Sequence, residues 1–495
     1  MTKHYAIEFF KFEKFNRVLF LFLSIIALTS SSCSKDDAPD TPTLPAVTTG
    51  TVTGTVKENE NFIVGATVIL KQTGQDDKSA TIGANGTFTF TNVPAGAASV
   101  VISFPSYITQ TTSVTVAAGI TTTLPVVMGG DPAIKTLIPD AKFEEILIKN
   151  GYDTAPVDGS VPTYKINKIK SLYLNDSGVA DLTGIQDFAA LESFSCSNIY
   201  GTSVIKLTSV DLSKNLALKT VDVSFNNITT IDISKNLALQ TLKMSSNLIT
   251  TLDVSNHTAL TLLYCDRNPL TTLDVTKNTL LKELGFGGTI STIDLSKNPA
   301  LVNLYSGGAK LNTLDVSKNP ALEVLWTENN NLTTLDVSKN AALKSLGCDG
   351  NKLTTLDLSG NPLLAMVTCS GNKITTIDVS KNINLATLYC PNNLISSLDV
   401  SNNPKLTSLN CPYNKLTSLD LSKNPLIAAV DGNYFACNNN LLTTLNLKNG
   451  NNKKFNGANF LNNASTLKIA VDDVDYSNTN WKAYKDASAT YVSSF

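Results

Sequence analysis

Histidine is almost missing from this chain of 495 residues, which contains only His4 and His257. His4 lies in an N-terminal segment that we expect to be cleaved, so the mature chain would keep one imidazole. That scarcity removes the commonest general base and most designs of zinc site. The P-loop, HExxH and GxSxG motifs are also missing. We therefore expect a protein that is not an enzyme, with no catalytic residue, cofactor or metal.

An excess of positive charge is missing as well, since 39 Lys and Arg residues stand against 41 Asp and Glu residues. A nucleic-acid partner needs a basic surface, so this class of ligand is excluded. Tryptophan (two residues) and methionine (four) are scarce, whereas Asn, Thr, Leu, Ser and Asp are abundant. Such a bias is typical of a repeat, because the composition of one unit is multiplied along the chain.

The N-terminus has the features of a signal peptide. Lys11, Lys14 and Arg17 precede an apolar run from Val18 to Leu28. This run is too short to span a membrane, for which a helix needs about 20 residues. The arrangement predicts a signal peptide over residues 1–32 and a secreted mature chain.

The residues that follow indicate a lipid anchor. Ser30 to Cys33 resembles a lipobox, although Ser30 stands where that motif prefers Leu. The resemblance implies cleavage before Cys33 and lipidation of its thiol; ordinary cleavage with an unmodified Cys33 is the alternative. Lys35-Asp36-Asp37 resembles the signal that sends some lipoproteins to the outer face of the outer membrane. We expect a surface-exposed outer-membrane protein with a proline-rich linker over residues 33–49.

Residues 50–130 change to short alternating strands. Thr51–Val56 and Ala66–Leu70 alternate apolar and polar residues, and Asn85-Gly86 is a strong hairpin signal. About seven such strands predict a small β-sandwich. Four segments resemble the carboxypeptidase regulatory-like domain, which has a transthyretin-like fold: Gly65–Val68, Asn85–Phe88, Val93–Gly96 and Pro105–Tyr107. The resemblance implies an accessory module, for which we favour a spacer role over ligand binding.

One sequence motif then recurs along the chain: Leu-Thr-Thr-Leu-Asp-Val-Ser-Lys-Asn, followed by Leu-x-x-Leu-x-Cys-x-x-Asn. Its aspartates recur at Asp211, Asp232, Asp253, Asp274, Asp294, Asp315, Asp336, Asp357, Asp378, Asp399 and Asp420. The step is 21 residues, except for 20 between Asp274 and Asp294. This is the signature of a leucine-rich repeat, in which each coil adds one strand to a parallel sheet. We expect the solenoid over residues 169–447, with about 13 strands.

Alternation along each strand of the repeat predicts which side chains point into the core and which point outward. In the coil from Leu260 to Leu270, Leu263 and Cys265 point inward and Tyr264 points outward. The asparagine three residues after each cysteine position is expected to be buried and bonded to unpaired backbone groups of the turn. This column contains Asn226, Asn247, Asn268, Asn330, Asn351, Asn372, Asn393, Asn414 and Asn440. The other half of the motif, Leu-x-x-Leu-Asp-Val-Ser, should form the opposite wall of each coil.

The cysteines of this column are expected to be buried free thiols. They are Cys265, Cys348, Cys369, Cys390 and Cys411, with Cys196 and Cys437 at the ends. Disulfides are the alternative, but side chains in register run parallel rather than toward each other. The 21-residue unit with its cysteines resembles the internalin-type leucine-rich repeats, which are surface adhesion proteins of bacteria. We expect a helical cap over residues 131–168, starting near Asp140, and a C-terminal cap over 448–495.

The aspartate column could be mistaken for a metal site. A lysine follows three residues after most of these aspartates, as Lys318 follows Asp315, so we expect two ladders of charge that neutralise each other on a solvated face. The column also lacks the glycine-rich spacing of calcium-binding β-rolls.

The outward column of the sheet is the candidate binding face. It runs Asp222, Lys243, Tyr264, Gly285, Tyr305, Trp326, Gly347, Thr368, Tyr389 and Asn410, in a chain that is 7% aromatic. Glu283, Glu328, Asp266 and Asp349 flank it. We select as ligand-binding residues Tyr264, Glu283, Tyr305, Trp326, Glu328 and Tyr389, because exposed aromatic residues favour binding. Scattered surface aromatics without function are the alternative.

These features predict a mainly β protein: a leucine-rich-repeat solenoid of 21-residue coils preceded by a transthyretin-like sandwich. The expected function is non-enzymatic adhesion or protein binding by a monomer at the cell surface. A glycan-binding lipoprotein that captures nutrients is the second possibility, with the aromatic residues as sugar platforms. The sequence leaves the partner open between an extracellular protein and a glycan.

Overall fold

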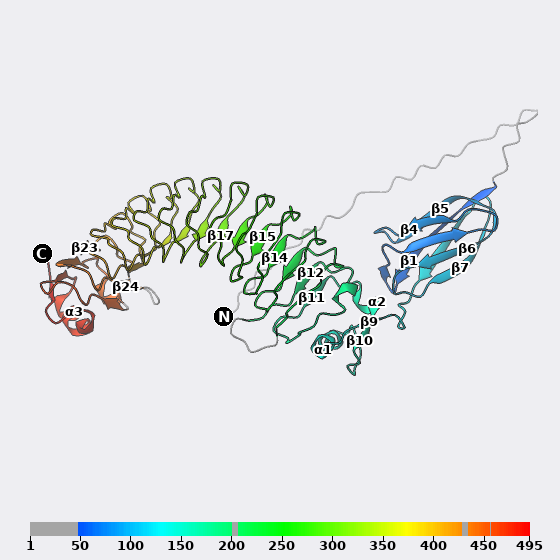
Figure 1. Ribbon diagram of the computed structural model, residues 1–495, viewed down its shortest axis with the longest axis horizontal. Coiled ribbons are helices and arrows are strands. Elements are labelled where there is room, and N and C mark those ends of the chain that lie inside the picture. The colour runs from blue at the N-terminus through cyan, green and yellow to red at the C-terminus, as the bar shows by residue number, and fades with distance from the viewer. Residues whose placement is uncertain (1–47, 200–205, 428–433, 456) are drawn as a thin grey trace, which may run out of the picture.

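A computed structural model describes residues 48–199, 206–427, 434–455 and 457–495. Figure 1 shows an antiparallel β-sandwich followed by a long curved solenoid. The expected signal peptide, Cys33 and nearly all of the linker lie outside the described residues. Within those ranges, no helix has the length and apolar character needed to cross a bilayer.

The sandwich contains eight strands, one more than predicted. They are β1 (Thr49–Glu58), β2 (Asn61–Phe62), β3 (Thr67–Lys71), β4 (Lys78–Thr81), β5 (Thr87–Pro94), β6 (Gly96–Ser103), β7 (Gln110–Val116) and β8 (Thr121–Val127). One sheet has the order β2-β1-β5, with β8 parallel to β1, and the other has the order β4-β3-β6-β7. Alternate residues such as Val52, Val56 and Val100 fill the core between them.

A small cap joins the sandwich to the solenoid. It contains β9 (Lys135–Leu137), α1 (Ala141–Lys149), β10 (Ser160–Pro162) and α2 (Thr163–Ile166). Asp140 is the N-cap of α1, as predicted: its Oδ1 accepts from the N–H groups of Lys142 and Phe143. Its Oδ2 accepts from the N–H groups of Ala180 and Asp181. One carboxylate therefore ties the cap helix to the first coil.

The solenoid is built on one parallel sheet of 14 strands, compared with about 13 predicted. The strands are β11 (Ser171–Tyr173), β12 (Ser193–Ser195), β13 (Thr220–Asp222), β14 (Thr241–Lys243), β15 (Leu262–Tyr264), β16 (Glu283–Gly285), β17 (Asn303–Tyr305), β18 (Val324–Trp326), β19 (Ser345–Gly347), β20 (Met366–Thr368), β21 (Thr387–Tyr389), β22 (Ser408–Asn410), β24 (Phe435–Ala436) and β26 (Ala458–Asn459). Figure 1 shows them along the inner side of the arc. Neighbouring strands pair in register, so equivalent residues form rows across the coils.

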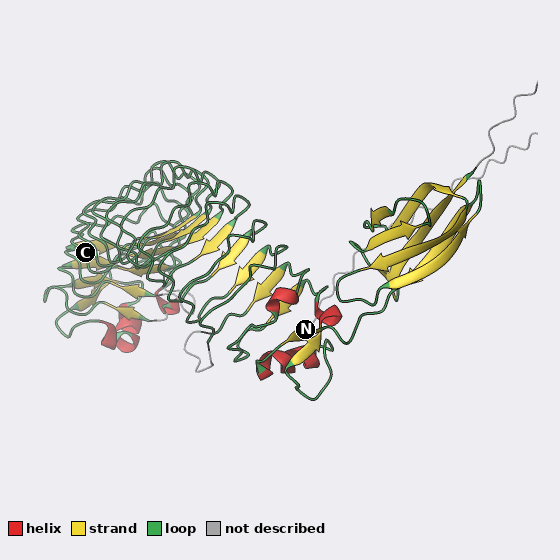
Figure 2. Ribbon diagram, turned by 45° about the vertical axis from the view of Figure 1, so that its right-hand side comes forward, coloured by secondary structure: helices red, strands yellow, loops and turns green. Residues whose placement is uncertain are grey.

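The opposite wall is mostly irregular, as Figure 2 shows. Isolated bridges join Asp211 to Asp232 and Asp357 to Asp378. Within the described residues, regular strands pair on this side only in the last coils. There β23 (Ser418–Asp420), β25 (Thr444–Asn446), β27 (Lys468–Ala470) and β28 (Thr490–Val492) form a second sheet. Coils on the outer side of an arc lie further apart, and strand pairing requires a spacing of about 4.8 Å.

The predicted asparagine column is confirmed. The Nδ2 of Asn247 donates to the carbonyls of Val223 and Met244 at 2.9 and 3.1 Å, and its Oδ1 accepts from the N–H of Ile228 at 3.0 Å. Thr289 and Ala309 take the asparagine position in two central coils and interrupt the ladder.

A second asparagine ladder runs along the solenoid and was not assigned from the sequence. Its members, all fully buried, are Asn215, Asn236, Asn278, Asn298, Asn319, Asn340, Asn361, Asn382, Asn403 and Asn424. The Nδ2 of Asn340 donates to the carbonyls of Val316 and Asn319 in the preceding coil, at 3.0 and 2.8 Å. His257 occupies the same column, with its Nε2 3.0 Å from the carbonyl of Ile233. This histidine therefore has a structural position.

The C-terminal segment covers the last coil. It contains η2 (Asn452–Lys454), α3 (Val474–Asn480) and η3 (Lys482–Tyr484). Trp481 is buried there, with its ring centroid 5.2 Å from that of Phe455. The repeat does not end at residue 447, where we expected it to end, because β26 extends the inner sheet. Asn463 also continues the first ladder, donating to the carbonyl of Cys437 at 3.2 Å.

Candidate binding face

Three aromatic residues form a continuous cluster in the middle of the inner face. The register places Tyr264, Gly285, Tyr305 and Trp326 in one row across β15 to β18. The ring centroids of Tyr264 and Tyr305 lie 6.1 Å apart, and those of Tyr305 and Trp326 lie 6.3 Å apart, both edge to face. A Cβ atom at Gly285 would lie 2.9 Å from the ring of Tyr264, so glycine leaves the space in which the rings meet. We call these three residues the aromatic cluster.

Polar contacts hold the ends of the cluster in place. The hydroxyl of Tyr264 donates to Oε2 of Glu283 at 2.6 Å, and Nε1 of Trp326 donates to Oγ of Ser345 at 3.0 Å. Burial raises the pKa of Tyr264, and the bond to Glu283 raises it further, so the hydroxyl stays a donor. Trp326 is nonetheless 39% exposed. The cluster is thus preorganised and open to a partner.

Glu328 lies beside the cluster, in space left by two glycines. A Cβ atom at Gly347 would lie 2.6 Å from Oε1 of Glu328, and one at Gly307 would lie 3.2 Å from Oε2. Burial raises the pKa of Glu328, and the neighbouring carboxylate of Asp349 raises it further. Burial also raises the pKa of Asp349, against the opposing effect of hydrogen bonds from Thr368 and Ser370. We call Glu328 and Asp349 the acidic pair.

Three of the four carboxylates beside the cluster have no ion-pair partner in the described part of the chain. Among the residues that the structure describes, no Lys or Arg lies within ion-pair distance of Glu283, Glu328 or Asp349. Asp266 differs, since Nε of Arg267 is 3.8 Å from its Oδ2. The inner face therefore combines exposed aromatic surface with unpaired carboxylates.

Five of the six residues selected from the sequence lie together: Tyr264, Glu283, Tyr305, Trp326 and Glu328. Tyr389 is in the same row on β21 but is separated from Trp326 by Gly347 and Thr368 on β19 and β20. It is therefore not part of the aromatic cluster. Asp349, which the sequence placed only at the flank, is part of the site.

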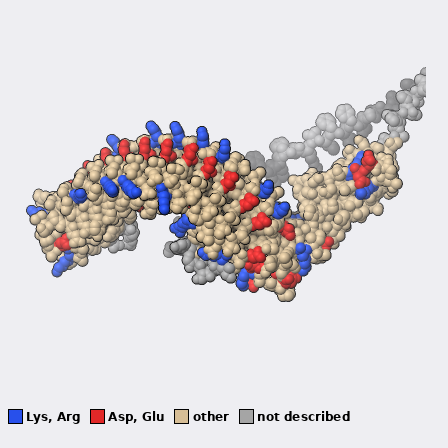
Figure 3. Space-filling model, viewed as in Figure 1, with Lys and Arg blue, Asp and Glu red and all other residues tan. Residues whose placement is uncertain are grey.

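The aspartates of the outer rim serve the turns of the solenoid. Oδ1 of Asp315 accepts from the backbone N–H of Ser317 at 2.8 Å, and the equivalent bond recurs in coil after coil. This backbone hydrogen bond lowers the pKa of Asp315, and Lys318 lowers it further. The described part of the chain contains no ion pair between these aspartates and the lysines three residues later. Figure 3 shows the acidic and basic groups as separate rows, so the expected mutual neutralisation is long-range only.

The cysteine column is buried, as predicted, and its thiols are free. The Sγ of Cys348 donates to the carbonyl of Thr368 at 3.5 Å, and that of Cys411 to the carbonyl of Ala436 at 3.5 Å. Burial raises the pKa of both thiols well above its usual value. These cysteines act as small apolar residues rather than as nucleophiles or ligands.

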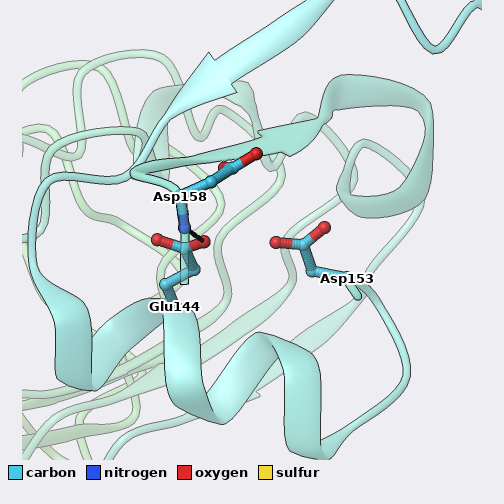
Figure 4. A group of neighbouring side chains, drawn as sticks. All are labelled: Glu144, Asp153 and Asp158. Carbon is cyan, nitrogen blue, oxygen red and sulfur yellow. Dashed lines mark hydrogen bonds between the residues drawn. The ribbon is translucent and has the colours of Figure 1, made fainter. Parts of the chain in front are cut away.

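A group of three carboxylates lies in the N-terminal cap, away from the inner face (Figure 4). Glu144 on α1 is buried, and its two oxygens accept from the N–H groups of Asp158 and Gly159 at 2.7 and 2.8 Å. Asp153 and Asp158 lie close to it. Because Glu144 already holds the loop that leads to β10, we assign this group a structural role.

Comparison with known proteins identifies both parts of the molecule. The family model of the carboxypeptidase regulatory-like domain matches residues 51–129. The functional domain of InlJ from Listeria monocytogenes, described as including a cysteine ladder, is 27% identical with a TM-score of 0.56. That match covers 69% of this chain and 77% of the InlJ chain.

Two further solved structures share the solenoid fold. The internalin InlF from Listeria monocytogenes is 22% identical with a TM-score of 0.57, covering 66% of this chain and 96% of that one. A leucine-rich-repeat protein from Leptospira interrogans is 19% identical with a TM-score of 0.52, covering 63% and 91%. A search among curated protein sequences found no significant match. The chain thus combines a carboxypeptidase regulatory-like domain with a leucine-rich-repeat solenoid that contains cysteines and is similar to the solenoids of internalins.

Proposed function

We propose that this protein is a non-enzymatic binding or adhesion protein that engages an extracellular protein through the inner face of its solenoid. The observation that carries the proposal is the aromatic cluster, which is fixed by its own contacts while Trp326 stays exposed. Large rigid aromatic residues lose little entropy on binding and dominate the energetics of protein interfaces. The rings occupy the outward position of the repeat, which is Gly285, Gly347 or Thr368 in other coils, so the solenoid does not need aromatic residues there.

The cell-surface location is part of the same proposal. A lipidated Cys33 would anchor a monomer to the outer membrane, with the linker and the sandwich as a spacer that carries the solenoid away from the bilayer. Cys33→Ala should release the protein from the membrane fraction and stop incorporation of labelled palmitate. Membrane association that is unchanged in this variant would contradict the anchor.

Glycan capture fits the inner face less well. A sugar platform built from several rings requires them to lie roughly in one plane, whereas neighbouring rings of the cluster lie at 83° and 74° to each other. The hydroxyl of Tyr264, which could bond a sugar, already donates to Glu283. Binding of the purified ectodomain to a glycan array, lost on Trp326→Ala, would favour the glycan function instead.

Alanine substitution in the cluster tests the protein-binding proposal. Screening the ectodomain against a panel of purified extracellular proteins should yield a partner whose affinity falls on Trp326→Ala by about 2 kcal/mol, or ~30-fold. Tyr305→Ala should act in the same direction. The control is Lys339→Ala, on the outer side of the solenoid, which should leave the affinity unchanged. A partner that binds both aromatic variants as tightly as wild type would place the site elsewhere.

A further inference from the structure

We propose that the inner face recognises a positively charged segment of its partner, with a Lys or Arg side chain placed between the aromatic cluster and the acidic pair. This inference rests on the proposed function and assigns a chemistry to the partner. A neutral or acidic segment would not match the charges of this surface.

The first argument comes from the rings. Aromatic faces attract cations, and the chain itself provides an example, since Nζ of Lys243 lies 5.9 Å from the ring centroid of Tyr264. Trp326, at the other end of the cluster, presents the largest and most exposed ring. In the described residues no cation lies over that ring. An incoming guanidinium or ammonium group can therefore make at Trp326 the contact that Lys243 makes at Tyr264.

The second argument comes from the carboxylates. Glu328 and Asp349 are half-buried like charges on adjacent coils, and each is partly removed from water without a counterion. Such a pair costs free energy in the unbound protein, and an arriving cation would offset that cost. The pKa of each carboxyl group is raised because burial disfavours its charged form.

The third argument comes from the lysines nearby, which are engaged elsewhere. Nζ of Lys344 lies 2.8 Å from Oε2 of Glu323, and Nζ of Lys352 donates to Oδ1 of Asn331 at 2.8 Å. Neither therefore serves as the counterion of the acidic pair. Gly307 and Gly347 keep side chains away from the carboxylate of Glu328. The charge of the acidic pair is thus left for a partner to neutralise.

The experiment uses synthetic peptides of defined charge as probes. A decapeptide that alternates arginine and serine is titrated into the ectodomain, alongside versions with citrulline or glutamate in place of arginine. Tryptophan fluorescence reports the binding, because Trp481 is only 2% exposed in the C-terminal cap and Trp326 is the other tryptophan. Binding of the arginine peptide at least about tenfold tighter than the citrulline peptide, and weakening with salt, is expected.

Two matched double variants locate the charge effect. Glu328→Gln with Asp349→Asn should weaken the arginine peptide about tenfold or more, since the counter-charges are removed. Asp336→Asn with Asp357→Asn removes the same charge from the outer rim and should leave the affinity within about twofold, because rim charges contribute little at a distance. Equal losses in the two double variants would mean general electrostatic attraction and would overturn the inference, as would equal binding of the arginine and citrulline peptides.

The same titration separates this inference from the proposed function. If the partner protein requires Trp326 but binds the Glu328→Gln, Asp349→Asn variant unchanged, the inner face remains the binding site and the cationic preference is wrong. If Trp326→Ala changes the affinity for neither the partner nor the peptides, the proposed function fails as well; calorimetry replaces fluorescence for this variant, because it lacks the reporting tryptophan.

Discussion

The outer rim and the inner face of the solenoid both carry carboxylates, but the two sets are held in opposite ways. On the rim, Asp315 accepts a hydrogen bond from the backbone of its own turn, which lowers its pKa. On the inner face, Glu328 and Asp349 lie half-buried beside each other, which raises theirs. The rim aspartates recur at the same position of the repeat motif in coil after coil, whereas Glu328 and Asp349 stand at a position whose residue varies between coils. Positions that repeat build the solenoid, and the departures from the repeat are where we propose that it binds.

The largest expected effect tests the structural half of this comparison. Asn340→Ala removes a buried amide and leaves the carbonyls of Val316 and Asn319 without that donor. We expect a loss of about 3 kcal/mol in the free energy of unfolding, measured by denaturant titration. The arginine peptide should still bind the folded fraction with wild-type affinity. A stability within experimental error of wild type would show that the second ladder is dispensable.

Charge reversal tests the binding half. Glu328→Lys places a cation next to Asp349 and should weaken the arginine peptide about 30-fold in calorimetry. Asp336→Lys makes the same change of charge on the rim, where it removes the acceptor for the N–H of Ser338. That variant should bind normally and unfold at a lower temperature. A loss of peptide affinity in Asp336→Lys but not in Glu328→Lys would contradict the assignment of binding to the inner face.

The smallest expected effect is a difference in the sign of the pH response. Asp315 on the rim has a folded pKa below its unfolded value of about 3.9, so its stabilisation is present above that value and is lost as the pH falls below about 4. Glu328 has a folded pKa above its unfolded value, so protonation stabilises the fold, and this gain is lost as the pH rises through the raised pKa.

The two signs can be measured by thermal unfolding between pH 3 and pH 7. Glu328→Gln should unfold at a slightly higher temperature than wild type at neutral pH, and the difference should vanish in acid. Asp315→Ala should unfold at a lower temperature at neutral pH, and that difference should vanish in acid too. A Glu328→Gln variant that is less stable than wild type at neutral pH would contradict the unpaired state of this carboxylate.

Periodicity was enough to predict the solenoid, the inward cysteines and the outward row that contains Tyr264 and Trp326. It was not enough for the second ladder, because Asn340 stands next to a turn and nothing in its spacing distinguishes a buried amide from an exposed one. The position of the Glu328 carboxylate next to Gly347 could not be predicted from the sequence either, because the two residues lie in different coils.

The two asparagine ladders give the solenoid a direction. Asn247 reaches back to the carbonyl of Val223, and Asn340 to that of Val316, each in the coil made before its own. The second ladder starts on the first coil, where Asn215 donates to the carbonyls of Ile185 and Phe188. A chain synthesised from its N-terminus therefore presents the acceptors before the donors arrive, so each new coil can close on a finished template. Loss of a coil from the C-terminal end leaves every remaining ladder amide with its acceptors. Loss of a coil from the N-terminal end removes the acceptors of the amides in the next coil.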